Sequence, residues 1–310
     1  MKMKLLKQAG LPDRLTAELH DAYDMCDYGT MSESELAAVA PIIDVMVTNG
    51  EAVVTAELIS QFPALKLIVV FGVGYDGVDV SAAASRGIAV THTPEVLTDD
   101  VADLAIGLMI ATCRKIVAAQ KFIERGGWQQ GGFQWTKKVS GARLGIVGMG
   151  RIGQAIARRA TGFSMAISYY DRRSRELAGW DFQSDIYELA RQSDILVVCI
   201  PGGEDTRGLI DAQVLRALGP EGVLINVGRG SVVDENALTE AIQQEYIAGA
   251  GLDVFSDEPE VPESLLQRDD VVVTPHMASA TWQTRAEMSR LVMENIRAWQ
   301  QGLPLVTPVR

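Results

Sequence analysis

Short apolar runs alternate with longer amphipathic stretches along most of the chain. Apolar runs without polar alternation are typical of strands buried on both faces of a parallel sheet, whereas the stretches between them have the spacing of helices. In the first part of the chain these runs predict strands at residues 4–7, 45–48, 67–71 and 88–91. The pattern therefore favours an α/β fold made of parallel βαβ units.

Helix-capping signals indicate where two helices of this first part begin. Ser32 stands three residues before Glu35, which is the spacing of a capping box. Residues 98–121 predict one long helix, because Thr98 is able to cap its start and two aspartates follow at the positive end of the helix dipole. Residues 124–138 hold four glycines and three aromatic residues, and this irregular composition predicts an ordered connecting loop.

A second and more regular alternation begins at Arg143. It predicts strands at residues 144–147, 166–170, 195–200, 223–227, 249–254 and 271–274. The last stretch with helical spacing, residues 280–301, has no strand after it. We therefore expect two domains, and we expect this final helix to return to the first domain and make it discontinuous.

Composition and charge exclude several classes of protein. The 310 residues are 47% hydrophobic and 22% charged, which excludes a disordered or collagen-like chain. The net charge of 28 − 40 = −12 disfavours binding to nucleic acid or to an anionic membrane. No apolar run approaches the ~20 residues that span a bilayer, and the amino terminus lacks the apolar core of a signal peptide. Cys26, Cys113 and Cys199 lie far apart in apolar stretches, which predicts buried free thiols and a cytoplasmic protein.

Gly148, Gly150 and Gly153 form a G-x-G-x-x-G sequence between an expected strand and an expected helix. In dinucleotide-binding sites the first glycine permits a tight turn, the second lets the backbone approach a pyrophosphate, and the third lets the helix pack closely on the strand. Arg151 and Ile152 stand at the start of the helix, where free N–H groups and the positive dipole end favour phosphate binding. The alternative interpretation is a glycine-rich turn that binds no ligand.

Charged residues after the next strand bear on which dinucleotide binds. Asp171 lies 171 − 148 = 23 residues beyond Gly148, near the spacing at which a carboxylate binds the adenosine ribose of NAD. Arg172, Arg173 and Arg175 instead suit the ribose 2′-phosphate of NADP, unless they only form a solvated loop. The two signals conflict; we expect NADP(H) to be preferred and NAD(H) to be possible.

Redox chemistry on a carbonyl requires a proton donor and a positive group that polarises the oxygen. His276 and Arg229 each follow an expected parallel strand, at the carboxyl end where α/β sheets bind ligands. An imidazole there is able to act as acid and base, and a guanidinium to bind a carboxylate. A loop after residues 249–254 supplies carboxylates that could orient the imidazole: Asp257, Glu258, Glu260 and Glu263. Spacing does not select one of them, and we expect the other two histidines, His20 and His92, to have structural or surface roles.

Several segments in their order and spacing resemble the D-isomer-specific 2-hydroxyacid dehydrogenase family over essentially the whole chain. They are F-G-V-G-Y-D-G-V-D (Phe71 to Asp79), L-T-D-D-V-A-D-L-A-I-G-L, G-M-G-R-I-G, I-N-V-G-R-G-S-V-V-D-E, G-A-G-L-D-V-F and T-P-H-M-A-S. Within the family the chain resembles the glyoxylate/hydroxypyruvate and hydroxyphenylpyruvate reductases in particular. The resemblance implies a Rossmann-type cofactor domain, residues 99–282, inserted into a flavodoxin-like substrate domain, residues 1–98 and 283–310.

The resemblance also implies roles at the reacting centre. The family's catalytic glutamate, histidine and arginine fall on Glu258, His276 and Arg229. Val73 and Gly74 belong to the glycine-rich segment whose N–H groups receive the substrate carboxylate, together with Arg229 and His276.

Cofactor roles follow from the same resemblance. Asp253 matches a position that holds the nicotinamide amide, and Thr98 matches one near the cofactor phosphates. Reductases of this subgroup usually prefer NADPH and carry a small or neutral residue where this chain has Asp171, so the chain departs from the pattern at that position.

The activity implied by the resemblance is reduction of a short 2-keto acid, such as glyoxylate or hydroxypyruvate, to the D-2-hydroxy acid with NAD(P)H. A bulkier aryl keto acid stays open as a substrate. We expect a homodimer paired through the cofactor domain and no metal ion. Two alternatives are a phosphoglycerate-type NAD dehydrogenase, although Arg310 ends the chain without an added regulatory domain, and a non-catalytic protein that senses dinucleotides.

Overall fold

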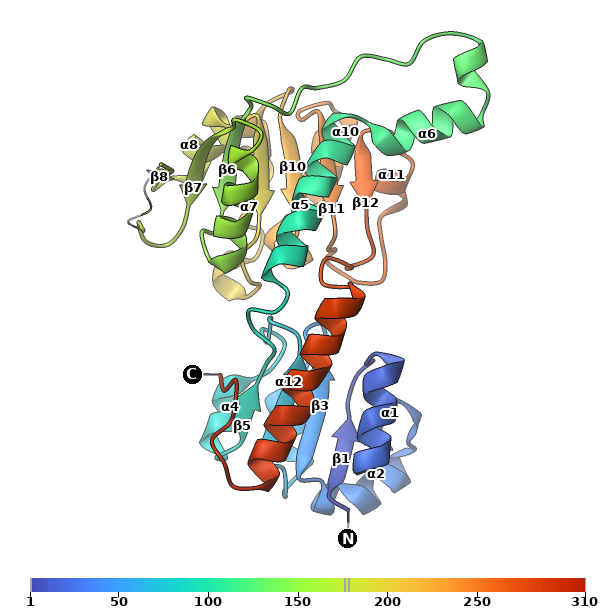
Figure 1. The fold of residues 1–310 in the computed structure, drawn as a ribbon, viewed down its shortest axis with the longest axis vertical. Coiled ribbons are helices and arrows are strands. Elements are labelled where there is room, and N and C mark those ends of the chain that lie inside the picture. The colour runs from blue at the N-terminus through green and yellow to red at the C-terminus, as the bar shows by residue number, and fades with distance from the viewer. Residues whose placement is uncertain (1, 176, 178, 310) are drawn as a thin grey trace. The chain divides into compact units, whose positions relative to one another are not determined.

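The chain divides into two compact units in a computed structural model, which describes residues 2–175, 177 and 179–309. The first unit comprises Met1–Leu97 and Ala280–Arg310, and the second comprises Thr98–Ser279. Each unit has a parallel sheet with helices on both of its faces (Figure 1). The α/β fold predicted from the alternation of apolar runs is therefore confirmed.

The first sheet has the strand order of a flavodoxin-like fold. Its strands are β1 (Lys4–Lys7), β2 (Asp24–Asp27), β3 (Val45–Asn49), β4 (Leu67–Phe71) and β5 (Ala89–Thr91). Among the described residues they pair in the order β2-β1-β3-β4-β5, and each pairing is parallel. The flavodoxin-like order places ligand-binding loops at the carboxyl ends of the central strands.

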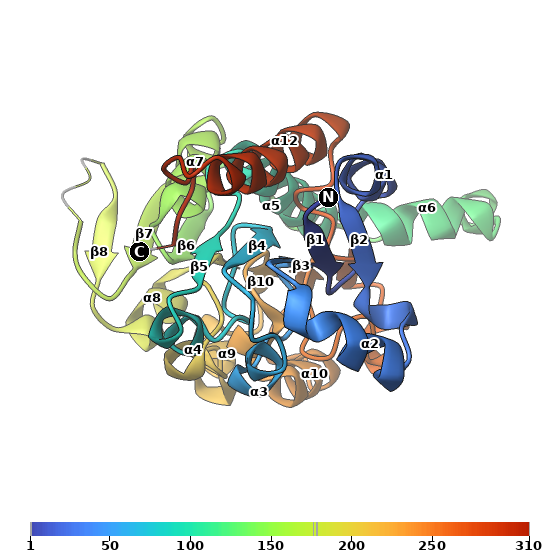
Figure 2. The same ribbon diagram turned by 90° about the horizontal axis from the view of Figure 1, so that it is seen from below.

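Helices cover both faces of this first sheet. They are α1 (Asp13–Ala22), α2 (Glu33–Val39), α3 (Ala56–Ser60), α4 (Val80–Ser85) and α12 (Trp282–Gln300), with 3-10 turns η1 (Tyr28–Thr30) and η2 (Ala40–Ile42). Figure 2 shows α1 and α12 on one face and α2, α3 and α4 on the other. The helix α12 packs against β4 and buries Met288, Val292 and Ile296. The final helix therefore belongs to the first unit.

The second sheet has the Rossmann-type strand order. Its strands are β6 (Arg143–Val147), β7 (Ala166–Tyr170), β8 (Asp181–Gln183), β9 (Ile195–Val198), β10 (Val223–Asn226), β11 (Gly249–Leu252) and β12 (Val271–Val273). Within the described ranges the order is β12-β11-β10-β9-β6-β7-β8, again with parallel pairing. Successive strands are added on one side of β6 up to β8 and on its other side from β9 onward, so the strand order reverses between β6 and β9. Open α/β sheets bind ligands at such a switch point.

The described helices of the second unit mostly cover the apolar central strands of its sheet. They are α5 (Thr98–Cys113), α6 (Ile116–Glu124), α7 (Arg151–Thr161), α8 (Ile186–Gln192), α9 (Ala212–Leu218), α10 (Glu235–Gln243) and α11 (Glu263–Leu266), with 3-10 turns η3 (Gly127–Gln129), η4 (Glu204–Thr206) and η5 (Gly230–Val232). Figure 2 shows α5 and α7 on one face and α8, α9 and α10 on the other. No helix in the part of the chain that the structure describes is long and apolar enough to cross a membrane.

Three features differ from the elements that the sequence predicted. The edge strands β2 and β8 were not predicted, because D-M-C-D and D-F-Q are short and polar. The single helix predicted at residues 98–121 is wrong: α5 ends at Cys113, and Lys115 adopts a left-handed backbone with φ of 48° before α6 begins. The returning chain stabilises this break, because the backbone N–H of Lys137 donates to the carbonyl oxygen of Cys113 at 3.0 Å.

Candidate active site

The glycine-rich turn after β6 has the geometry that a pyrophosphate site requires. Gly148 has φ of 101°, and a side chain there would collide with Ile200. A Cβ atom on Gly153 would collide with the carbonyl oxygen of Gly148, so this glycine permits the close approach of α7 to the turn. Gly150 caps α7 and has open space within 4 Å of an added Cβ. The three glycines therefore shape a turn whose open side lies at Gly150, and this arrangement fits a dinucleotide phosphate.

Two helices of the second unit, α7 and α5, begin with residues that were predicted to bind the cofactor phosphates. Arg151 and Ile152 are the first residues of α7, and their N–H groups precede the first helical hydrogen bond, which Gln154 donates to Gly150. Thr98 is the first residue of α5, which lies alongside α7 (Figure 1). These helix starts supply N–H groups and positive dipole ends of the kind that bind phosphate.

Arg159 fixes α5 and α7 to each other. Its Nε donates to Asp103 Oδ1 at 2.5 Å and its Nη2 donates to Asp99 Oδ1 at 2.9 Å. Arg159, in the last turn of α7, thus bridges two carboxylates near the Thr98 end of α5 and holds the two helices together.

Cys199, which follows β9, has a structural contact with the same turn. Its thiol donates to the carbonyl oxygen of Gly148 at 3.1 Å. Burial and the negative charge of Asp171 raise the pKa of Cys199 to about 12, so the thiol stays protonated near neutral pH. All three cysteines are free thiols. Cys113 is buried, and Cys26 and Cys199 are half-buried.

Asp171 is hydrogen-bonded to its own neighbours in the loop after β7. Its Oδ2 accepts from Arg175 Nε at 2.9 Å and from the N–H of Met149 at 3.3 Å, and its Oδ1 accepts from the N–H of Arg172 at 2.7 Å. The side chains of Arg172 and Arg173 are exposed. The carboxylate charge at this position is therefore balanced by Arg175, while two further guanidinium groups are accessible beside it.

The turn that presents Arg229 is stabilised by a buried asparagine. Asn226, the last residue of β10, accepts from the N–H of Gly228 and donates to the carbonyl oxygen of Arg229, both at 3.0 Å. Gly228 approaches the backbone of Ile200 closely. Arg229 is half-buried, and its Nη1 donates to the carbonyl oxygen of Gly228 at 2.8 Å. Asn226 stands in the I-N-V-G-R-G segment, but no local signal in the sequence predicted this role for it.

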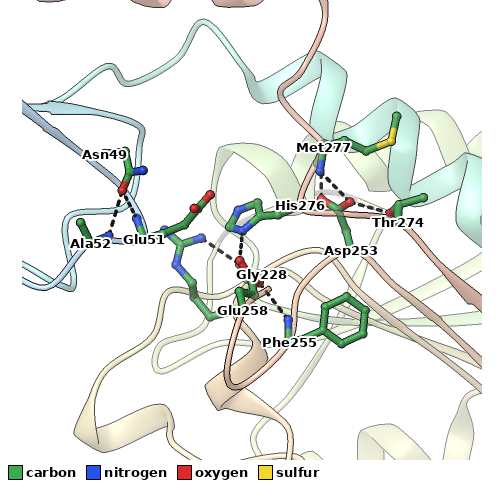
Figure 3. A network of polar contacts seen from close by, with 12 residues as sticks. Asn49, Glu51, Ala52, Gly228, Asp253, Phe255, Glu258, Thr274, His276 and Met277 are labelled. Atoms are coloured by element: carbon green, nitrogen blue, oxygen red, sulfur yellow. Dashed lines mark hydrogen bonds and ion pairs between the residues drawn. The ribbon is translucent and has the colours of Figure 1, made fainter. Parts of the chain in front are cut away.

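Asp253 organises the turn that presents His276. Its fully buried carboxylate accepts from Thr274 Oγ1 at 2.5 Å and from the N–H groups of Met277 and Ala278, both at 2.9 Å (Figure 3). The N–H of His276 donates to the carbonyl oxygen of Asp253 at 2.9 Å. Burial raises the pKa of Asp253, although these hydrogen bonds and the charge of His276 oppose that rise. Asp253 therefore has a positioning role that its sequence position alone did not indicate.

His276 and Glu258 form a short charge-assisted pair (Figure 3). Nδ1 of His276 lies 2.6 Å from Oε2 of Glu258, and Oε1 of Glu258 accepts from the N–H of Phe255 at 2.9 Å. The two side chains are 26% and 22% exposed, so the pair is mostly shielded from water. Because a carboxylate oxygen accepts, Nδ1 carries the proton of this hydrogen bond.

The charges around Glu258 keep it ionised. Burial alone raises the pKa of Glu258, but the hydrogen bond and the charge of His276, the N–H of Phe255 and the charge of Arg229 outweigh burial and hold the pKa below its usual range. Of the four carboxylates that the sequence left open, Glu258 is therefore the one that pairs with the imidazole. Glu263 instead lies in α11 and accepts from the side chain of Gln267 at 2.8 Å.

Val73 and Gly74 follow β4 in the first unit. The carbonyl oxygen of Val73 lies 2.9 Å from Nδ1 of His92, and the carbonyl oxygen of the preceding Gly72 accepts from the N–H of Thr93 at 2.8 Å. No described residue accepts a hydrogen bond from the N–H of Val73 or of Gly74. The segment thus presents two adjacent backbone donors, which suit an anionic ligand.

Comparisons with known proteins agree with this architecture. The sequence profile of the family described as D-isomer specific 2-hydroxyacid dehydrogenase, NAD binding domain, matches residues 106–278. The chain is 46% identical over 297 residues to a hydroxyphenylpyruvate reductase from Plectranthus scutellarioides, with 95% of each chain covered. It is 43% identical over 307 residues to the glyoxylate/hydroxypyruvate reductase A HPR2 from Arabidopsis thaliana, with 98% of each chain covered.

A solved structure gives the same result for the fold. The crystal structure of an NADPH-dependent glyoxylate/hydroxypyruvate reductase from Sinorhizobium meliloti, in complex with NADP and malonate, superposes with a TM-score of 0.92 at 40% sequence identity. The match covers 100% of this chain and 97% of that one. The second unit therefore contains an NAD-binding domain, and the chain belongs to the D-isomer-specific 2-hydroxyacid dehydrogenase family.

Proposed function

We propose that this protein reduces a short 2-keto acid of the glyoxylate/hydroxypyruvate class to the D-2-hydroxy acid, with NADPH as the preferred cofactor. The observation that carries the proposal is the 2.6 Å pair between His276 and Glu258, with the charge of Arg229 acting on Glu258. The names of the relatives at 46% and 43% identity support the same chemistry.

In the proposed reaction His276 is the proton donor. Glu258 holds Nδ1, so that Nε2 is the ring atom that gives its proton to the keto oxygen, and the carboxylate stabilises the imidazolium before transfer. A reduced nicotinamide, when bound by the second unit, would supply the hydride for the carbonyl carbon. Arg229 polarises the keto oxygen and binds the adjacent carboxylate.

The first unit supplies further contacts to the substrate, and the second unit supplies the contacts to the cofactor. The first unit binds the substrate carboxylate through the N–H groups of Val73 and Gly74. The second unit binds the dinucleotide through the N–H groups and side chains of the glycine-rich turn, the two helix starts and the loop after β7. The proposed dinucleotide-binding residues are Thr98, Gly148, Gly150, Arg151, Ile152, Gly153, Asp171, Arg172, Arg173 and Asp253. Of these, Asp253 binds the nicotinamide amide.

The preference for NADPH rests on the loop after β7. A free carboxylate at Asp171 would repel a ribose 2′-phosphate, but Arg175 neutralises it at 2.9 Å. Arg172 and Arg173 are exposed and have the planar donors that bind a phosphate in bidentate fashion. The same carboxylate is able to accept from the ribose hydroxyls of NADH once Arg175 moves away, so NADH stays a usable cofactor.

A second candidate substrate is an aryl keto acid. The relative that is 46% identical is named hydroxyphenylpyruvate reductase, and it covers 95% of the chain. The catalytic pair is the same for both substrates, so only the side-chain pocket of the substrate distinguishes them.

Initial rates test the proposal directly. The purified chain is assayed with NADPH and with NADH, each against glyoxylate, hydroxypyruvate, phenylpyruvate and hydroxyphenylpyruvate, by loss of absorbance of the reduced nicotinamide. We expect turnover of glyoxylate and hydroxypyruvate with a higher kcat/KM for NADPH. Faster turnover of the aryl acids would favour the second candidate. Absence of turnover with all four acids would favour a dinucleotide-sensing protein instead.

We also propose that the protein is a homodimer and that it resides in the cytoplasm. Exposed apolar side chains extend along α6 and the segment after it, with Trp135 98% and Trp128 69% exposed. A homodimer paired through this part of the second unit covers that surface. The free cysteines suit the reducing cytoplasm, where we place the protein.

A further inference from the structure

We propose that His92 is a positioning residue for recognition of the substrate carboxylate. Its imidazole fixes the peptide group between Val73 and Gly74, so that the Gly74 N–H is directed at the substrate. This inference rests on the proposed function, because it assigns a task to a residue behind the proposed carboxylate-binding segment.

The contact between His92 and the segment is direct. Nδ1 of His92 lies 2.9 Å from the carbonyl oxygen of Val73. A carbonyl oxygen has no proton to donate, so Nδ1 carries the hydrogen and His92 is the donor. The ring of Tyr75 stands edge-on to the imidazole, with centroids 5.1 Å apart at 90°, and keeps the ring in this orientation.

The geometry of the peptide bond transmits this contact to the other side of the segment. In a trans peptide the C=O and N–H groups lie in one plane and point in opposite directions. The carbonyl oxygen of Val73 shares its peptide with the Gly74 N–H, and the carbonyl oxygen of Gly72 shares its peptide with the Val73 N–H. His92 holds the first carbonyl and the Thr93 N–H holds the second at 2.8 Å. Both N–H groups are therefore turned away from residues 92 and 93, and neither has an acceptor among the described residues.

The hydrogen bond from His92 also polarises the peptide group between Val73 and Gly74. A hydrogen bond to the carbonyl oxygen of a peptide increases the positive charge on its N–H, because bonds in a chain strengthen one another. The His92 contact therefore makes the Gly74 N–H a stronger donor to an anion as well as a fixed one.

The end of the chain holds His92 itself in place. The hydroxyl of Thr307 donates to the carbonyl oxygen of His92 at 2.5 Å, and the N–H of His92 donates to the carbonyl oxygen of Thr307 at 3.2 Å. The fully buried side chain of Asn295 in α12 accepts from the N–H groups of Val306 and Thr307 and donates to Thr307 Oγ1. A rigid support of this kind is what a residue that positions a ligand-binding backbone requires.

Two substitutions separate positioning from packing. His92→Phe keeps an aromatic ring beside Tyr75 and removes the donor, whereas His92→Asn removes the ring and places an amide N–H near the position of Nδ1. His20→Phe is the matched control, because His20 is an exposed histidine on α1. For each protein we would measure kcat and KM for glyoxylate, the dissociation constant of NADPH by fluorescence without keto acid, and the melting temperature.

We expect His92→Phe to raise the KM for glyoxylate roughly 3- to 10-fold, the loss expected for one hydrogen bond, with less than a ~2-fold change in NADPH affinity. His92→Asn restores most of the lost affinity for glyoxylate, and His20→Phe matches the unmodified chain. An unchanged KM in His92→Phe overturns the inference. Equal weakening of glyoxylate and NADPH with a lower melting temperature in both His92 variants also overturns it, because a packing role would then explain the result. If the unmodified chain reduces no keto acid, the proposed function fails instead.

Discussion

At the scale of single residues, the backbone of His276 adopts a conformation that non-glycine residues rarely have. Its φ is 46°, in the left-handed region. Such a conformation costs about 1–3 kcal/mol and persists where the surroundings hold it firmly. Here Asp253 supplies the support, since its carboxylate binds the two N–H groups that follow His276. The strained turn aims the imidazole at Glu258, which is the contact that the proposed chemistry depends on.

Replacement of His276 by alanine tests its role as proton donor. We expect His276→Ala to lower kcat by about 10²- to 10⁴-fold, the usual contribution of a positioned acid, because no other group in the pair supplies the proton. The dissociation constant of NADPH should stay nearly constant, since the glycine-rich turn is untouched. Initial rates and fluorescence titration measure the two quantities, and His20→Ala serves as the control. A variant that keeps the kcat of the unmodified chain would remove His276 from the mechanism.

The depressed pKa of Glu258 gives a pH dependence of stability whose sign is defined. The folded-state pKa lies below the usual value of 4.5, so ionised Glu258 stabilises the fold above pH 4.5, and this contribution is lost as the pH falls through the folded-state pKa. Glu258→Gln does not titrate and lacks this contribution. We therefore expect the melting temperature of the unmodified chain to exceed that of Glu258→Gln at pH 6, and the difference to shrink below pH 4.5. A difference that stays constant from pH 6 to pH 3 would contradict this expectation.

At the scale of elements, the loop after β7 is held by a residue of that strand. The N–H of Arg175 donates to the hydroxyl oxygen of Tyr169 at 2.9 Å, and that hydroxyl donates to the carbonyl oxygen of Arg175 at 2.8 Å. Tyr169 is fully buried, so the loop is anchored to the core rather than only solvated. This anchoring supports an interpretation of the arginines as a binding element.

The double variant Arg172→Ala/Arg173→Ala tests cofactor preference. Each charge-assisted hydrogen bond to a phosphate contributes about 1.5–3 kcal/mol, so we expect the KM for NADPH to rise by about 10- to 100-fold. The KM for NADH should change by less than ~3-fold, because NADH lacks the 2′-phosphate. Arg158→Ala, an exposed arginine in the last turn of α7, is the control. Equal losses with both cofactors would show that these arginines do not distinguish NADPH from NADH.

Local sequence signals predicted most elements because the signals themselves are local. Buried parallel strands are apolar on both faces, and the capping box at Ser32 and Glu35 is present as expected. The break at Lys115 escaped prediction, since a hydrogen bond from the distant Lys137 stabilises it. In the candidate site, Arg229 and His276 followed from their places after strands. Spacing did not select Glu258, because pairing across the sheet depends on loop conformation rather than on distance along the chain.

At the scale of the whole molecule, the net charge of −12 opposes the proposed ligands, which are all anions. We therefore expect binding to depend on local positive groups and backbone N–H donors that act at short range. In the second unit these are the guanidinium groups of Arg172, Arg173 and Arg229 and the start of α7. In the first unit they are the two backbone N–H groups after β4.

The exposed apolar surface along α6 and the following segment tests the proposed homodimer. Covering a large apolar surface favours association, so we expect the unmodified chain to be a dimer by light scattering coupled to size exclusion. Trp128→Ser/Trp135→Ser should raise the dimer dissociation constant at least ~10-fold, because two large aromatic side chains at an interface commonly contribute more than about 1.4 kcal/mol. Trp282→Ser is the matched control, since Trp282 is 92% exposed but lies on α12 of the first unit. A monomeric unmodified chain would refute the dimer, and equal effects of the control would place the interface elsewhere.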